Sequence, residues 1–122
     1  MQDHRIDLDV KFHPLERIDV GAEARATDPW SNQTLTQVND SVVRLGVIEG
    51  DFHWHKHDAE DEFFLVLEGA LEIDVEGSDT IALAPHQGVT IPKGVVHRPR
   101  ALGRTVIVMV EPATVVPTGD PS

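Results

Sequence analysis

The sequence predicts an all-β fold, a sandwich or barrel of about nine to eleven short strands. Apolar and polar residues alternate with period two in several segments, as they do in half-buried strands. Turn-forming Gly, Pro, Asn and Asp residues separate these segments at intervals of roughly 8–12 residues. No segment carries a sustained helical periodicity of apolar residues. Together these observations indicate an all-β architecture.

The N-terminal third is expected to begin with strands and to continue as a polar loop. Residues 5–12 alternate between apolar and charged side chains, which predicts a half-buried strand. Residues 14–21 predict a second, weaker strand. Residues 22–40 are polar and contain Asp-Pro and Ser-Asn turn signals, so we expect a loop there. Residues 1–40 would thus hold the N-terminal strands and loop.

The rest of the chain alternates between strand-like segments and turns. Residues 41–49 are rich in β-branched side chains, 62–68 are almost continuously apolar, and 105–110 are apolar on both faces. Shorter runs complete the predicted strands, at 52–57, 70–76, 80–83, 89–91 and 95–101. Residues 111–122 contain three of the eight prolines, so we expect a tail that lies across the surface or frays.

Size and composition restrict the possible functions. The 122 residues suit a single domain over residues 1–122. The absence of cysteine excludes a disulfide framework, a cysteine-ligated metal and a cysteine nucleophile. With 21 acidic and 10 basic residues, the formal net charge of −11 argues against binding to nucleic acid or to an anionic membrane. We see no signal-peptide pattern and no apolar run of about 20 residues, so we expect a cytoplasmic protein with a small-molecule or metal partner.

Three of the seven histidines fall within five residues, at His53, His55 and His57. Residues at i, i+2 and i+4 of a strand share a face, so two of these imidazoles can converge on one metal ion. Of the four acidic residues at 58 and 60–62, Glu62 is the best further ligand, because it leads an apolar strand where an unpaired carboxylate is costly. His97 follows a tight Pro-x-Gly turn and is flanked by valines, which indicates burial. Three histidines and one glutamate around an open position are typical of iron, manganese, nickel or zinc sites.

The spacing of these residues resembles the two sequence motifs of the cupin superfamily. The first is Gly50-x4-His55-x-His57-x4-Glu62-x6-Gly69, and the second is Pro92-x-Gly94-x2-His97; both lie within residues 50–101. The resemblance implies a double-stranded β-helix, a barrel of jelly-roll type. It also implies one divalent transition metal inside the barrel, held by His55, His57, Glu62 and His97. Small cupins commonly pair through sheet edges and N-terminal strands, so a homodimer is expected as well.

Three positions depart from the cupin motifs. The first glycine stands one residue closer to the histidines than usual, His86 occupies the place of a glycine, and Ala101 occupies the place of an asparagine. None of these positions ligates metal in the family, so the expected metal site is kept. The departures weaken any transfer of one subfamily's substrate chemistry to this chain.

Strand parity predicts which side chains surround the ion. Residues on the faces of Glu62 and His97 are expected to line a mostly apolar pocket; they are Phe64, Val66, Pro99 and Ala101. His53 lies further out, at the pocket edge, and is the one candidate proton carrier for catalysis. The chain has no tyrosine, and no second carboxylate clearly enters the pocket. Arg98 and Arg100 point away from the ion and are expected to pair with surface acids.

Two classes of function fit these expectations. The first is a metal-dependent enzyme of oxygenase, isomerase or lyase type, in which the ion acts as a Lewis acid or activates oxygen for reaction with a small molecule. The second is a non-catalytic module that binds a small molecule or a metal. The sequence names neither the metal nor the ligand, because an all-His/Glu site accepts several metals and a fold does not determine a function. We favour the enzyme as the working hypothesis.

Overall fold

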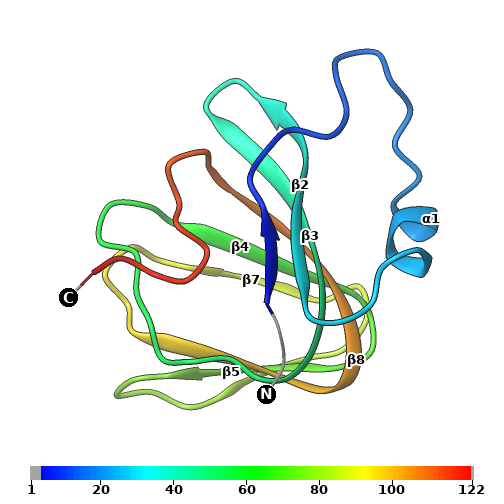
Figure 1. Cartoon of the computed structure of the whole chain (residues 1–122). Helices are drawn as coiled ribbons and strands as arrows, with labels where there is room; N and C mark the ends of the chain where they lie inside the picture. The colour runs from blue at the N-terminus through cyan, green and yellow to red at the C-terminus, as the bar shows by residue number, and fades with distance from the viewer. Residues whose placement is uncertain (1–3, 122) are drawn as a thin grey trace.

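Strands are the main secondary structure of this protein. The structure is a computed structural model that describes residues 4–121. The elements are β1 (Arg5–Asp7), α1 (Val20–Arg25), β2 (Ser31–Val38), β3 (Ser41–Asp51), β4 (Glu62–Glu68), β5 (Leu71–Val75), β6 (Ile81–Leu83), β7 (Gly88–Ile91) and β8 (His97–Pro112). Their strands hydrogen-bond into one sheet that curls on itself (Figure 1). The predicted all-β, jelly-roll type of fold is confirmed.

The long strand β8 organises the barrel because it pairs with three other strands. Its first part, from His97 to Ala101, pairs antiparallel with β5, and its second part pairs antiparallel with β4. Its other edge pairs antiparallel with β3. Gly103 lies between the two parts at φ 100°, in the left-handed region that favours glycine, and the strand bends around the barrel there. The two strands predicted at 95–101 and 105–110 are therefore one bent strand.

The N-terminal third differs most from the prediction. Within residues 5–12, only Arg5–Asp7 forms a strand, and it runs parallel to β2. The strand predicted at 14–21 is wrong. The helix α1 begins at the end of that segment, where the Asp19 side chain caps it by accepting a hydrogen bond from the N–H of Ala22 at 2.9 Å.

The loop predicted for residues 22–40 is also wrong, because most of α1 and all of β2 lie within it. The strand β2 lacks apolar alternation because several of its buried side chains are polar, among them Ser31, Asn32 and Thr34. It nevertheless pairs along both edges, with β1 on one side and β3 on the other. Backbone pairing, rather than an apolar pattern of its own, makes this segment a strand.

The remaining strands β3 to β7 lie within two residues of their predicted bounds. The exception is the segment 52–57, which is not a continuous strand. Its backbone makes one isolated antiparallel bridge, between His55 and His97. This loop between β3 and β4 carries the histidine cluster.

Two apolar clusters stabilise the barrel from opposite faces of the sheet. The larger one fills the interior and includes Ile48, Phe64 and Met109. The second lies on the outer face, where α1 and the segment before it cover Leu45 and Val47 of β3. Because Leu45 and Val47 alternate with Gly46 and Ile48 along β3, both faces of this strand are covered.

The C-terminal segment after β8 turns back across the barrel toward the histidine loop (Figure 1). The backbone N–H of Asp120 donates to the carbonyl of Lys56 at 2.9 Å, and Val115 is buried. The expected tail therefore lies across the surface over its described part. Within residues 4–121, no helix is long and apolar enough to span a membrane.

Candidate metal centre

Backbone hydrogen bonds join the histidine loop to the turn before β8 and to the start of that strand. His55 and His97 exchange two of them, from the His55 N–H to the His97 carbonyl at 3.0 Å and from the His97 N–H to the His55 carbonyl at 2.9 Å. The N–H of Gly94 donates to the carbonyl of His57 at 2.8 Å. The loop thus places His55 and His57 beside His97. Glu62, the first residue of β4, faces them from the next strand.

The four side chains converge in the barrel interior. One ligand atom from each of His55, His57, Glu62 and His97 lies within 4.8 Å of the others. Oε1 of Glu62 lies 3.5 Å from Nε2 of His57 and 3.5 Å from Nε2 of His97. Donor atoms that share an ion at about 2.1 Å are roughly 3.0–3.5 Å apart. These two spacings therefore suit donors that share a single transition-metal ion.

Hydrogen bonds to backbone carbonyls orient two of the imidazoles. Nδ1 of His55 lies 2.9 Å from the carbonyl of His53, and Nδ1 of His97 lies 2.9 Å from the carbonyl of Val95. A carbonyl can only accept, so each Nδ1 carries the proton and each Nε2 keeps its lone pair. Metal-ligating histidines are oriented in this way, with the second nitrogen donating to a fixed acceptor.

Several buried polar atoms of the cluster lack a hydrogen-bond partner in the described part of the chain. They are both ring nitrogens of His57, Nε2 of His97 and Oε1 of Glu62. Buried polar atoms without partners are costly, and three of these four face one another across the cluster. A metal ion would satisfy these three, and the set of three imidazoles and one carboxylate suits iron, manganese, nickel or zinc. The residues present fit the expected cofactor.

The electrostatics favour metal-binding protonation states for two of the four residues. Burial lowers the pKa of His55 to about 4, so its imidazole is neutral at pH 7. Burial alone would raise the pKa of Glu62, but its interactions with His57 and His97 lower it to about 2. For His57, burial lowers the pKa, and the interaction with Glu62 and the charges of Asp120 and Glu60 outweigh it and raise the pKa. The imidazole of His57 therefore holds its proton to a higher pH than an ordinary histidine does, and a metal ion competes with that proton.

A second buried carboxyl group, that of Glu111, lies near the cluster. Glu111 is 2% exposed, and its Oε2 lies 3.5 Å from Nη1 of the buried Arg44. Burial, and then the charge of Glu62, raise the pKa of Glu111 to about 9, so this carboxyl holds its proton at pH 7. Glu111 is buried in the interior but is not among the residues that line the cavity described below. The sequence pattern places residue 111 in the tail, whereas it belongs to β8.

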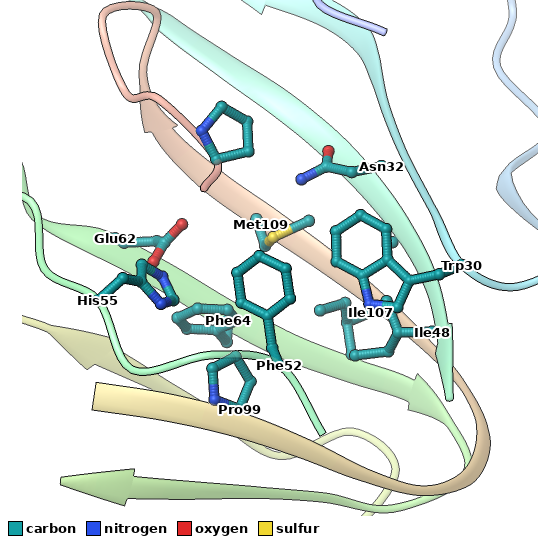
Figure 2. Close-up of a pocket in the computed structure, with 12 residues that line it drawn as sticks. Trp30, Asn32, Ile48, Phe52, His55, Glu62, Phe64, Pro99, Ile107 and Met109 are labelled. Carbon is teal, nitrogen blue, oxygen red and sulfur yellow. The ribbon is translucent and has the colours of Figure 1, made fainter. Parts of the chain in front are cut away.

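An apolar cavity adjoins the cluster (Figure 2). His55 and Glu62 stand at one end, and Trp30 and Asn32 stand at the other. The volume of the cavity is about 30 Å³, which is enough for about two water molecules. The walls are mostly apolar; they include Ile48, Phe52, Phe64, Pro99, Ile107, Met109 and Pro117. The cavity therefore joins two of the four candidate ligands to a small, mostly apolar chamber.

The structure brings some of the expected pocket residues to this cavity and leaves others away from it. Phe64 and Pro99 line it. Val66 and Ala101 are buried in the interior cluster but are not among the lining residues. His53 is exposed, and its Nε2–H donates to the carbonyl of Thr118 at 2.6 Å, outside the cavity.

The arginine prediction is confirmed, because both side chains bind acidic residues on the opposite face. Arg98 Nη2 donates to Asp74 at 2.8 Å, and Arg100 donates to Asp74 at 2.7 Å and to Glu72 at 2.6 Å. These contacts with Arg100 and Arg98 hold the pKa of Asp74 well below its usual range. This network lies on β5 and β8 and does not take part in the candidate centre.

Sequence reasoning missed several residues near the centre, among them Trp30, Asn32, Phe52 and Glu111. Trp30 and Asn32 lie in the segment expected as a loop, although Trp30 stacks on Phe52 with ring centroids 5.1 Å apart. Oδ1 of the buried Asn32 has no hydrogen-bond partner among residues 4–121. Glu111 directly follows the apolar run at 105–110, and extending that predicted strand by one residue would have included it.

Comparisons with known proteins agree with this geometry. The Cupin_2 family model, described as a cupin domain, matches residues 41–111. The uncharacterized protein YdbB of Bacillus subtilis (strain 168) is 46% identical over 81 residues, which cover 66% of this chain and 72% of that protein. A crystal structure of a cupin-2 domain containing protein from Shewanella frigidimarina matches with a TM-score of 0.74 and 34% identity, over 78% of this chain and 93% of that chain.

A third match extends the likeness of the fold alone. Protein NMB1881 from Neisseria meningitidis has a TM-score of 0.72 and 23% identity, over 80% of this chain and 99% of that chain. The family match spans β3 to β8, which includes all four candidate ligands. The chain belongs to the cupin-2 family of cupin-domain proteins.

Proposed function

We propose that this protein is a metal-dependent enzyme that acts on a small molecule, with His55, His57, Glu62 and His97 as the metal ligands. One observation carries the proposal: His55 and Glu62 belong to the four-residue cluster and also line the apolar cavity. A molecule in the cavity would therefore lie against the metal. When bound, a divalent iron, manganese, nickel or zinc ion supplies Lewis-acid or oxygen-activating chemistry.

The residues of the chain hold and surround the substrate. The mostly apolar walls lower the polarity of the surroundings, which strengthens electrostatic interactions at the cluster end of the cavity. At the far end, the amide of Asn32 offers a hydrogen bond in these apolar surroundings. A substrate that enters this cavity would have to be very small or displace part of its walls, and its polar groups would face the metal at one end and Asn32 at the other. The protonated carboxyl group of Glu111, near Glu62, could donate a proton inside the barrel.

Metal binding is the first test of the proposal. Purified protein would be stripped of metal, reconstituted separately with iron, manganese, nickel and zinc, and assayed for bound metal by elemental analysis. We expect about one ion per chain in the wild type and a loss of binding in His55→Ala and His97→Ala. His13→Ala serves as the matched control, because His13 is exposed and distant in sequence from the cluster. Equal metal content in all four proteins would overturn the ligand assignment.

Catalysis is the second test. Each reconstituted protein would be assayed for oxygen consumption with small diketone, thiol and catechol candidates, and for isomerase and lyase products by NMR. We expect turnover with one metal that is lost in His97→Ala.

A specific observation favours the alternative, a non-catalytic module that binds a small molecule or metal. Apart from the candidate ligands, no side chain that lines the cavity in the described residues titrates near neutral pH. A module of this kind would bind a ligand tightly and turn over no candidate with any metal. Isothermal titration of the same panel against the loaded protein separates the two functions.

We also propose that the protein is a cytoplasmic homodimer. Leu8, which follows β1, and Val110, on β8, are exposed apolar residues. Burying such residues against a second copy would be favourable. Light scattering coupled to size exclusion tests the dimer, and a monomeric mass at micromolar concentration would overturn it.

A further inference from the structure

A C-terminal strap, defined as residues 113–121, crosses the histidine loop. It lies beyond the segment matched by the family model, which ends at residue 111. Thr114 donates its hydroxyl to Glu60 at 2.6 Å, and the carbonyl of Thr118 accepts from His53 at 2.6 Å. Pro117 lines the cavity. The strap is therefore in contact with the loop, the cavity and the surroundings of the candidate metal centre.

Asp120 of the strap forms hydrogen bonds with the two residues that flank His57 in the sequence. Its backbone N–H donates to the carbonyl of Lys56 at 2.9 Å, and its Oδ2 accepts from the backbone N–H of Asp58 at 2.7 Å. These two bonds involve the residues on either side of His57. One carboxylate oxygen of Asp120, Oδ1, is left free of these bonds.

The side chain of His57 is oriented differently from those of the other two histidines. His55 and His97 each use Nδ1 to donate to a backbone carbonyl, whereas Nδ1 of His57 has no hydrogen-bond partner in residues 4–121. The residue is only 2% exposed, so bulk water does not take that place. With Nε2 facing Glu62, Nδ1 is the nitrogen left for a second partner.

Two carboxylates stand near His57 on the strap side. A ring nitrogen of His57, a carboxylate oxygen of Glu60 and one of Asp120 all lie within 4.8 Å of one another. A separation of this size is bridged by one water molecule or closed by rotation of a carboxylate. Glu60 is engaged by Thr114, while Asp120 is held by the backbone on both sides of His57.

We propose that Asp120 is a positioning residue of the metal centre, whose carboxylate accepts the Nδ1–H of His57, directly or through one water, and so aims Nε2 at the ion. This inference rests on the proposed function, because it assumes that His57 ligates a metal. It assigns a task to a segment outside the family match. A carboxylate on a ligating histidine fixes its tautomer and raises its basicity.

The neighbouring residue of the strap shows how closely this segment approaches the ligands. Gly119 has φ +97°, and a Cβ built on it would lie 2.5 Å from Cβ of His55. No side chain fits between the strap and His55 at this position. Gly119→Ala would therefore lift the strap and with it Asp120, without changing any charge.

The test compares the zinc affinity of the full-length protein and its variants, by competition with a chromophoric chelator. We expect Asp120→Asn to weaken zinc binding about tenfold or more, because outer-sphere partners typically contribute 10- to 100-fold. Asn can still accept the Asp58 N–H and keep the strap docked, so this variant isolates the carboxylate. Asp120→Glu should recover part of the affinity, and Gly119→Ala should lose affinity as well. Asp79→Asn, in the exposed turn between β5 and β6, is the charge-matched control.

A spectroscopic readout separates positioning from a merely structural role. In ¹⁵N-histidine NMR spectra of the zinc-loaded protein, we expect a solvent-protected Nδ1–H signal for His57 that is lost in Asp120→Asn, while those of His55 and His97 persist. If Asp120→Asn binds zinc within twofold of wild type and keeps this signal, the inference is wrong and the proposed function stands. If wild type binds no zinc or other divalent metal, the proposed function fails and this inference fails with it.

Discussion

Replacing Glu111 by glutamine should flatten the pH dependence of stability of the metal-free protein. In the folded state, burial and then the charge of Glu62 raise the pKa of Glu111 from 4.5 to about 9. Between these two values the folded chain holds a proton that the unfolded chain has released. Stability therefore falls as pH rises through this window, by up to about 1.4 kcal/mol per pH unit.

The expected size of the effect follows from the same values. Through this group alone, the free energy of unfolding at pH 7 is about 3 kcal/mol lower than at pH 4.5. A glutamine at this position keeps the volume of the side chain and cannot ionise, so it removes this cost. Relative to wild type, the Glu111→Gln variant should gain stability progressively from pH 5 to pH 8.

The assay is urea unfolding in the presence of a chelator at pH 5, 6, 7 and 8, for wild type, Glu111→Gln and the control Glu49→Gln. Glu49 is an exposed carboxyl on β3. The difference between wild type and each variant cancels the titration of the histidines, which is common to all three proteins. Parallel pH curves for wild type and Glu111→Gln would refute the reasoning, because they would mean that Glu111 is ionised in the folded protein.

Three further changes test other parts of the structure. Gly69→Ala should destabilise the fold by about 3 kcal/mol or more, because the residue has φ +89° and an added Cβ would lie 2.7 Å from the carbonyl oxygen of Arg104. Gly77→Ala should cost only about 1 kcal/mol, because the residue has φ +76° but an added Cβ would meet open space. Equal losses of stability for the two variants in thermal unfolding would contradict this prediction. Asn32→Leu should stabilise the metal-free fold by about 1 kcal/mol, because it removes a buried acceptor without a described partner, and a lower melting temperature would show that the amide is satisfied. Zinc at a hundred times its Kd should stabilise the wild type by about 2.7 kcal/mol but leave the melting temperature of His97→Ala unchanged.

The histidine cluster shows what local spacing can predict. Two sequence motifs identify His55, His57, Glu62 and His97, and the structure brings them together within 4.8 Å. The parity argument for the first two assumes a continuous strand at 52–57, which does not exist. An isolated bridge between His55 and His97 fixes the backbone at that one position instead.

The polar strand β2 shows where local spacing fails. Its buried positions carry Ser31, Asn32 and Thr34, so no apolar alternation marks it. Its partners are β1 and β3, and hydrogen bonds to them decide its conformation. Because the strand was not predicted, Asn32 was not expected to line the cavity.

Sequence alone determined the all-β class, most of the strand boundaries from β3 onward, and the identity of the four clustered residues. These properties depend on period-two patterning, on turn residues and on short-range spacing, which are all local. Only the tertiary structure decided that Glu111 lies against Arg44 and near Glu62, and that Asp120 reaches His57. Each of these contacts joins segments about 50 to 70 residues apart, and no local pattern encodes such an approach. Burial in the interior of the closed barrel then raises the pKa of Glu111.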